Sequence, residues 1–296
     1  MNKRVIATFF AILAAALYAI NIPFSKILIE YVDATIMAGL LYLGAGIGMF
    51  LYVSMGKTFG KEVVKEPLTR KELPYTISMI VLDIFAPILL MNGVKMTSSS
   101  NATLLNNFEI VATSIIALVI FKEVISSRLW IAIVLVTLSS IILTFDGLGS
   151  FQFNIGSVLV LGATVCWGLE NNCTNKISNK SSEEIVIIKG IFSGLGSLIA
   201  AFLIGEKIPS WMYIGAVLLL GFVSYGLSIN FYISAQKHIG AAKTSAYYSI
   251  APFLGVIFSL FLLGERPTPQ FYIALIVMIV GTILIVFDTL YGEKVK

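Results

Sequence analysis

Long apolar stretches dominate this chain and restrict what it can fold into. Ten stretches of about 20 residues are apolar enough to cross the hydrocarbon core of a bilayer, and charged or glycine- and proline-containing turns separate them. A backbone in lipid must satisfy its own hydrogen bonds, and barrel-type alternation is absent from the sequence, so the predicted spanning elements are helices. The predicted spans are roughly 5–29, 34–55, 74–93, 99–121, 128–146, 154–175, 184–204, 211–234, 241–263 and 269–288.

The composition excludes a soluble domain of this size. Of 296 residues, 58% are hydrophobic and 12% are charged, whereas soluble domains carry about 25% charged residues. Disordered, collagen-like and disulfide-scaffold proteins are excluded on the same grounds. The net charge of +4 gives no reason to expect a nucleic-acid partner, because the placement of the basic residues matters more than their sum. The expected partners are the lipid bilayer and a small-molecule substrate.

The distribution of lysine and arginine predicts the orientation. With the N-terminus inside, the inner segments hold about fifteen basic residues and the outer segments about three. Both termini are therefore expected in the cytoplasm, and the number of helices is expected to be even. The basic start at Met1–Arg4 resembles a signal peptide, but the apolar run continues to Ile29, which favours a retained first helix.

An internal repeat divides the chain into halves. A shift of about 142 residues lays 95–146 on 237–288 without a gap, with about nine identities that include Glu123 with Glu265. The predicted repeats are residues 1–149 and 150–296, with five helices each. Because five is odd, the second repeat enters the membrane with the opposite orientation. Inverted repeats with a site between them are typical of transporters, although an old duplication without mechanistic meaning would leave the same pattern.

Paired motifs accompany the repeat. The first span carries Tyr18 through Lys26, and the sixth carries Trp167-Gly168 through Lys176. The fourth and ninth spans begin with VKMTSSSNATLL and QKHIGAAKTSAY and end with FKE and LGE. In their order and duplication these motifs resemble the EamA-type members of the drug/metabolite transporter superfamily over nearly the whole chain.

The resemblance implies a carrier built from two inverted five-helix repeats around a central cavity. It implies no particular substrate, because that superfamily moves amino acids, amines, nucleotide sugars and other metabolites. Two departures prevent the transfer of substrate contacts from relatives. Tyr18-Ala19 replaces the family's Trp-Gly, and the arginine often found in the second and seventh spans is missing, with Leu40, Leu41 and Lys189 nearby.

Glu109, near the middle of the fourth predicted span, is the first candidate for chemistry. Asn106, Glu109 and Thr113 follow helical spacing and share a face with Thr103. Insertion of a charged carboxylate at this depth of the membrane costs free energy, so such a residue is expected to have a function. It could bind a cationic amine, or hold a proton that the substrate displaces, since burial disfavours the charged form. The alternative is a polar packing network in which Glu109 is neutral.

The sixth span offers a second candidate group. Glu170 follows Trp167 by nearly one turn, and an indole ring can face a cation. In the first span, Tyr18 and Asn21 form a similar stripe, and Asn21 aligns with Glu170. Asn21 and Glu170 are therefore expected to form a pseudo-symmetric pair at one cavity. The alternatives are a salt bridge of Glu170 with Lys26 or Lys176, and interhelical hydrogen bonds of Asn21.

The remaining candidates lie in the first, third, eighth and ninth spans. Asp83 is expected either to contribute to a negative cavity or to neutralise Lys26, which on the family pattern is structural. Tyr225, Ser228 and Tyr248 have polar tips that suit an amphipathic cavity, although aromatic stripes also serve packing. Pro23, Pro87 and Pro252 can bend helices where a cavity needs it.

The sequence as a whole predicts a secondary transporter that works by alternating access. Its expected substrate is a cationic or zwitterionic amine or amino acid, with proton-coupled export as one form of the reaction. An uncoupled channel and a membrane scaffold or sensor are the alternatives. An integral-membrane enzyme is disfavoured, because the chain has one histidine and no clustered metal ligands or phosphate loop. No cofactor or metal is expected, a homodimer is permitted, and a prokaryotic inner membrane is the expected location.

Overall fold

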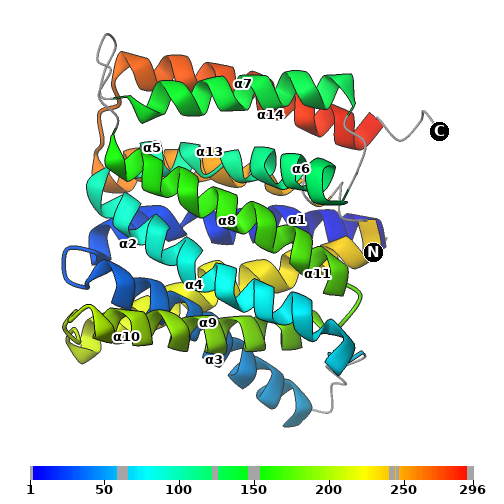
Figure 1. Cartoon of the computed structure of the whole chain (residues 1–296), viewed down its shortest axis with the longest axis vertical. Coiled ribbons are helices and arrows are strands. Elements are labelled where there is room, and N and C mark those ends of the chain that lie inside the picture. The colour runs from blue at the N-terminus through cyan, green and yellow to red at the C-terminus, as the bar shows by residue number, and fades with distance from the viewer. Residues whose placement is uncertain are drawn as a thin grey trace.

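The structure is a bundle of helices that run roughly along one direction (Figure 1). The computed structural model describes residues 3–58, 66–121, 126–145, 154–239, 244 and 247–291, and all regular structure in these ranges is helical. In chain order the elements are α1 (Lys3–Ala19), α2 (Asn21–Leu28), α3 (Ala34–Thr58), the 3-10 turn η1 (Arg70–Glu72), α4 (Leu73–Met96), α5 (Ser99–Leu105), α6 (Phe108–Phe121), α7 (Ser127–Thr144), α8 (Ile155–Ile177), α9 (Ser182–Leu203), α10 (Trp211–Gly221), the π-helix η2 (Phe222–Leu227), α11 (Ser228–Ile239), α13 (Ala251–Leu263) and α14 (Pro269–Tyr291).

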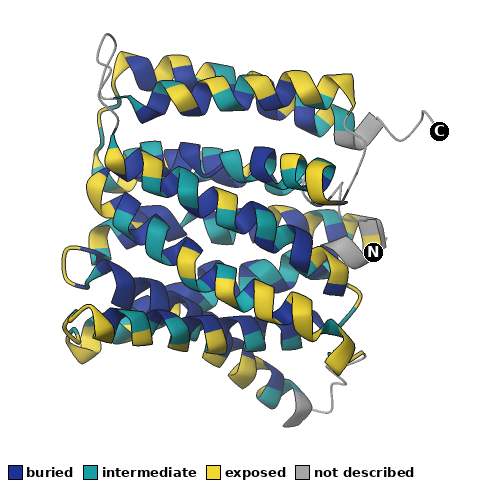
Figure 2. Ribbon diagram, in the orientation of Figure 1, coloured by how far each residue is buried: buried dark blue, intermediate teal, exposed yellow. Residues whose placement is uncertain are grey.

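The outer faces of the helices are apolar, as a lipid environment requires. Phe9 on α1, Leu219 on α10 and Ile276 on α14 expose 58%, 63% and 63% of their surface, and Figure 2 shows exposed residues along the outward faces of the bundle. A soluble protein rarely leaves apolar surface of this extent uncovered. The chain is therefore a multi-pass integral membrane protein.

Eight of the ten predicted spans are helical segments long and apolar enough to cross a membrane within the described residues. The other two are α8 and α13. α8 has 23 residues, but its second half carries Glu170, Asn171, Asn172 and Lys176, which lower its hydropathy. α13 has 13 residues, because the helix begins only at Ala251, immediately before Pro252.

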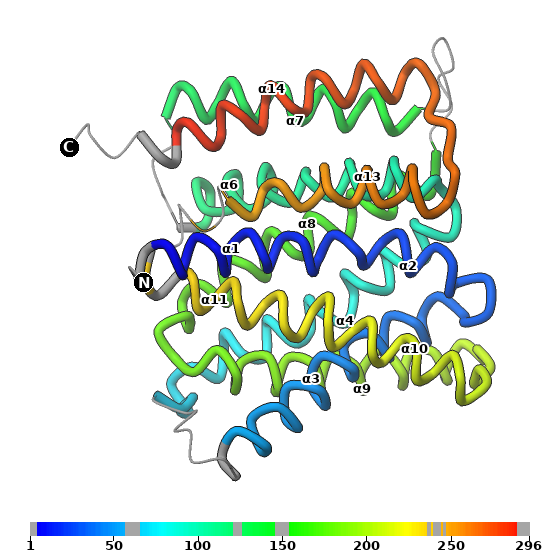
Figure 3. The backbone as a smooth tube through the Cα atoms, turned by 180° about the vertical axis from the view of Figure 1, so that it is seen from behind, coloured from blue at the N-terminus to red at the C-terminus, as the bar shows by residue number. Residues whose placement is uncertain are grey.

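The helix contacts link elements far apart in the sequence. α3 packs against α9, α4 against α8, α1 against α11, α5 against α13 and α7 against α14. The α7–α14 pair forms one lateral edge of the bundle, at the top in both views of the backbone (Figures 1 and 3). α1 begins and α14 ends at the same end of the helices (Figure 1).

Close packing of α3 on α9 depends on glycine. A Cβ added at Gly190 would lie 2.3 Å from the backbone nitrogen of Gly46, and one added at Gly46 would lie 2.6 Å from that of Ile191. Only a residue without a side chain allows two backbones to approach this closely. The glycine runs GLLYLGAGIG of α3 and GIFSGLG of α9 therefore form this packing surface.

Several helices are interrupted near their middle. The first span breaks at Ile20, between α1 and α2, and the fourth breaks at Asn106 and Asn107, between α5 and α6. A π-helix, η2, lies between α10 and α11, and turn residues Ser249 and Ile250 precede α13. Such breaks are tolerated at membrane depth where neighbouring protein satisfies the freed backbone groups. By contrast, α4 continues through Pro87.

Two Gly-Glu turns cap helices of the first half of the chain. Glu265 accepts hydrogen bonds from the N–H groups of Ser99 (2.7 Å) and Ser100 (2.9 Å) at the start of α5. Glu206 accepts from the N–H groups of Thr35 (3.1 Å) and Ile36 (2.7 Å) at the start of α3. In both turns the preceding glycine has a positive φ, +80° at Gly205 and +61° at Gly264, which glycine adopts without strain. A carboxylate at a helix N-terminus also complements the helix dipole.

Removal of the Glu265 carboxylate should destabilise the protein. Glu265→Ala leaves the first N–H groups of α5 without acceptors, so we expect a loss of about 1–2 kcal/mol and a lower melting temperature of the purified protein. Glu265→Gln retains one oxygen acceptor and should lose less, and Glu66→Ala at an exposed position is the control. Equal melting of Glu265→Ala and wild type would contradict the capping role.

Candidate functional site

A buried ionic cluster lies at the centre of the helix packing. The Lys189 ammonium on α9 lies 3.0 Å from Oδ2 of Asp83 on α4 and 3.0 Å from Oε1 of Glu170 on α8. The exposed fractions of the three side chains are 8%, 0% and 2%. Desolvation of charges in such a place is costly unless they are paired and hydrogen-bonded. The three charges therefore depend on one another.

Hydrogen bonds hold the carboxylates of this cluster. Oδ1 of Asp83 accepts from the Tyr42 hydroxyl of α3 at 2.8 Å and from the Trp167 indole N–H of α8 at 3.2 Å. The Thr174 hydroxyl, one turn along α8, donates to Glu170. Hydrogen bonds to ionised groups are stronger than neutral ones and fix orientation. Four helices, α3, α4, α8 and α9, thus contribute to one cluster.

A series of tyrosines extends from the ionic cluster across the protein. The ring of Tyr42 lies 5.1 Å from that of Tyr225 in η2, Tyr225 lies 5.8 Å from Tyr18 of α1, and Tyr18 lies 5.8 Å from Tyr248. These spacings are those of favourable aromatic contacts. The faces and hydroxyls of these rings provide an amphipathic surface beside the buried charges.

Asparagines at the helix breaks bind these tyrosines. Asn21, the first residue of α2, donates to the Tyr225 hydroxyl at 3.1 Å. Asn106, between α5 and α6, donates to the Tyr18 hydroxyl at 3.0 Å. Asparagine competes for backbone hydrogen bonds and so favours helix ends. The same residues therefore interrupt the helices and anchor the aromatic side chains.

Glu109 lies between the tyrosines and the ionic cluster. It is partly buried in the first turn of α6 and accepts a hydrogen bond of 2.6 Å from the amide of Asn171 on α8. It is within electrostatic range of Tyr18, Glu170 and Lys189. Among the described residues it forms no ion pair, so its charge is less compensated than the charges of Asp83 and Glu170.

The structure brings most of the residues predicted from the sequence together. One group forms the ionic cluster and the other lines the tyrosine series. Ser228, at the start of α11, donates to the carbonyl of Ala14 at 2.8 Å and so joins α11 to α1. The predicted residues in the ionic cluster are Asp83, Trp167 and Glu170; those in the tyrosine series are Tyr18, Asn21, Asn106, Tyr225, Ser228 and Tyr248.

Lys26 lies elsewhere, and its suggested pairing with Asp83 is wrong. Its ammonium donates to the carbonyls of Val94 (2.6 Å) and Thr97 (2.7 Å) and so binds the C-terminal end of α4. Lysine near a helix C-terminus compensates the free carbonyls there. Asp83 and Glu170 pair with Lys189 instead of with Lys26 or Lys176.

Sequence reasoning missed three residues of the site, namely Lys189, Tyr42 and Asn171. The rule that an ionisable residue inside a span is functional would have singled out Lys189, which lies in the apolar run of α9. Tyr42 lies in an apolar run of α3, and Asn171 lies beside Glu170. Neither has a local signal that indicates its partner.

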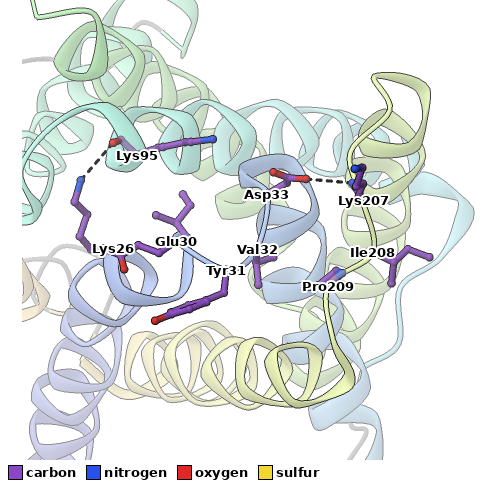
Figure 4. Close-up of a pocket in the computed structure, with 10 residues that line it drawn as sticks. Lys26, Glu30, Tyr31, Val32, Asp33, Lys95, Lys207, Ile208 and Pro209 are labelled. Carbon is purple, nitrogen blue, oxygen red and sulfur yellow. Dashed lines mark hydrogen bonds between the residues drawn. The ribbon is translucent and has the colours of Figure 1, made fainter.

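A separate pocket opens at one end of the bundle. It has a volume of about 460 Å³ and is lined by residues that include Lys26, Glu30, Asp33, Lys95 and Lys207. Figure 4 shows these side chains around the ends of α2 and α4 and the segment before α10. The pocket lining carries charges of both signs and includes none of Asp83, Glu170 and Lys189, so the pocket is separate from the ionic cluster.

Replacement of Lys189 should be much more damaging than replacement of a surface lysine. Lys189→Met leaves the carboxylates of Asp83 and Glu170 buried without a cation, so we expect a loss of about 3–5 kcal/mol. A Lys189→Met/Asp83→Asn double variant should recover part of it. Lys180→Met is the control, since Lys180 pairs with Glu72 at 3.8 Å near the surface and should cost at most about 1 kcal/mol. Similar melting of the Lys189→Met and Lys180→Met proteins would contradict the importance of the cluster.

Comparison with known proteins supports a transport role. The EamA-like transporter family matches residues 5–145 and 154–287. An uncharacterized transporter of Methanothermobacter thermautotrophicus is 24% identical over 297 residues, covering 94% of this chain and 85% of that protein. The uncharacterized transporter YyaM of Bacillus subtilis is 23% identical over 245 residues, covering 79% and 77%.

A protein of known crystal structure has a similar fold. Its TM-score is 0.70 at 15% identity, and the match covers 98% of each chain. At this identity the likeness shows the fold alone. The family match covers nearly the whole described chain, in two consecutive stretches. The chain belongs to the EamA-like transporter family.

Proposed function

We propose that the protein is a secondary active transporter of small cationic or zwitterionic amines, with its substrate site at the centre of the bundle. One observation carries the proposal: interrupted helices meet beside buried acidic side chains. The breaks of the first and fourth spans and the π-helix η2 supply Asn21, Asn106 and Tyr225 to the same region as Asp83 and Glu109. Discontinuous helices around a central site are typical of secondary transporters.

The contact pattern supports an inverted repeat of five plus five spans. If α1–α2 corresponds to α8, α4 to α10–α11, and α5–α6 to α13, then the α4–α8 contact corresponds to α11–α1, and α6–α8 corresponds to α13–α1. All four contacts are present. The two stretches matched by the family lie on either side of the predicted boundary between residues 149 and 150. With α8 and α13 included, the proposed number of spans is ten.

The charge balance of the centre favours an amine. Three carboxylates, those of Asp83, Glu109 and Glu170, face one ammonium, that of Lys189. The excess negative charge attracts a cationic group, and the neighbouring Trp167 and Tyr18 offer ring faces to it. Because Glu109 has no ion pair among the described residues, it is the group available to an incoming ammonium or to an exchanging proton.

Alternating access gives the ionic cluster a second role. Asp83 belongs to the first repeat, whereas Glu170 and Lys189 belong to the second. A movement of one repeat against the other must therefore change the distance between Lys189 and Asp83. A substrate ammonium that approaches Asp83 competes with Lys189 for it, so substrate binding weakens the link between the repeats. Energy for transport then comes from a gradient of the substrate or of an ion.

The proposed location is the cytoplasmic membrane of a prokaryote, with both termini in the cytoplasm. The relatives come from bacteria and an archaeon. The distribution of lysine and arginine along the sequence favours a cytoplasmic side for the end of the helices at which α1 begins and α14 ends.

Glu109→Gln tests the proposed role of the free carboxylate. In proteoliposomes with a pH gradient, uptake of radiolabelled amines and amino acids should fall roughly tenfold or more, or lose its dependence on pH. The reason is that the amide can neither bind the substrate ammonium as an anion nor exchange a proton, so the coupling between substrate and proton is lost. The melting temperature should change little, since the amide preserves the shape of the side chain. Glu183→Gln, at the start of α9, is the matched control. Unchanged pH-dependent uptake by the Glu109→Gln protein would contradict this assignment.

A further inference from the structure

The pocket of about 460 Å³ lies between the two proposed repeats, beside the end of α2 and the start of α10 (Figure 4). This end of the bundle is opposite the one at which α1 begins and α14 ends (Figure 1). Lys26, residues 29–33 and Lys95 of the first repeat line one part of the pocket, and residues 207–209 of the second repeat line the other. A cavity of this size can enclose a small organic molecule, and such ligands commonly bind between structural units. The pocket is therefore a candidate for a second binding site.

Two of the charged groups at the pocket already bind backbone atoms. The ammonium of Lys26 donates to three carbonyls at the C-terminal end of α4. Because an ammonium has three N–H donors, Lys26 has none left for a ligand. Oδ2 of Asp33 accepts from the backbone N–H of Lys207 at 3.1 Å, which leaves its Oδ1 available.

The other charged side chains at the pocket are those of Glu30, Lys95 and Lys207. Within the part of the chain that the structure describes, these side chains form no ion pair and no hydrogen bond. Figure 4 shows Lys95 extended from the end of α4 toward Asp33, with Lys207 beside Asp33. Glu30 lies on the side of the pocket nearer to Lys26. Two ammonium groups and two carboxylates are thus available to a ligand in one pocket.

From this arrangement we propose that the pocket binds a small zwitterion, namely a free amino acid with an apolar side chain. The carboxylate of the ligand pairs with the ammonium groups of Lys95 and Lys207, and its ammonium pairs with Glu30 or with Oδ1 of Asp33. Hydrogen bonds between ionised groups are about twice as strong as neutral ones. A ligand of only one charge satisfies half of these groups and brings a like charge close to the other half, so the pocket selects against it.

The rest of the lining and its position define what the site does. Ile29 and Ile208 also line the pocket and suit the apolar side chain of the ligand. Because Lys95 belongs to the first repeat and Lys207 to the second, a bound zwitterion links the repeats at this end. In the orientation proposed above, the pocket faces the outside and is filled according to the external concentration of the amino acid. Binding itself depends neither on that orientation nor on transport through the central site.

The test is the binding of a ligand series to the purified, full-length protein that carries Glu109→Gln. This substitution weakens the proposed central site but does not touch the pocket, whose lining does not include Glu109. The series is L-leucine, L-leucinamide, which lacks the carboxylate, and N-acetyl-L-leucine, which lacks the ammonium, and calorimetric titration gives each Kd. We expect L-leucine to bind roughly tenfold or more tightly than either derivative, since each derivative loses a hydrogen-bonded charge. No binding of L-leucine, or equal binding of either derivative, would overturn the inference.

Variants in the same background locate the site. Lys95→Gln and Lys207→Gln each remove one ammonium, and each should raise the Kd for L-leucine roughly tenfold, as expected for the loss of a hydrogen bond to a charged group. Both lysines are exposed, so the variants should fold and melt like the parent protein without ligand. Lys71→Gln, at an exposed lysine before the start of α4, is the matched control and should leave the Kd unchanged. An unchanged Kd in both pocket variants would place the amino acid elsewhere and overturn the assignment.

Discussion

The ion cluster of Lys189, Asp83 and Glu170 is the interaction on which the rest of the structure depends. A lysine ammonium inside an apolar bundle is tolerated only because two carboxylates lie 3.0 Å from it. This arrangement fixes α4, α8 and α9 relative to one another, and Tyr42 and Trp167 add α3 to the same group. The glycine contacts between α3 and α9 make that approach possible.

Irregular backbone meets at the tyrosine series, which adjoins this cluster through the contact of Tyr42 with Tyr225. The breaks at Ile20 and at Asn106–Asn107 and the π-helix η2 would be costly if they faced lipid. Here the asparagine and tyrosine side chains at these points bond to each other, so the polar groups lie inside the protein. At the ends of the helices, the Gly-Glu turns at Glu206 and Glu265 satisfy N–H groups that would otherwise lack acceptors.

The sequence predicted those features that depend on local pattern. Hydropathy and length identified the helical segments, because both are read from consecutive residues. Paired motifs pointed to Asn21 and Trp167. Pairings between distant helices could not be read in this way: Lys189 and Asp83 are more than 100 residues apart, and Lys26 was an equally plausible cation for Asp83. Hydropathy also could not show that α13 begins as late as Ala251.

The account rests on a central site with excess negative charge, and a ligand screen by charge tests it most directly. The melting temperature of the purified protein would be measured with amines, amino acids, neutral sugars, organic acids and nucleotide sugars. A ligand at 100 times its dissociation constant stabilises the folded state by about 2.7 kcal/mol, which such an experiment detects. The account predicts selective stabilisation by amines or amino acids. Stabilisation only by organic acids or nucleotide sugars would contradict it and would make Lys189 the substrate-binding group.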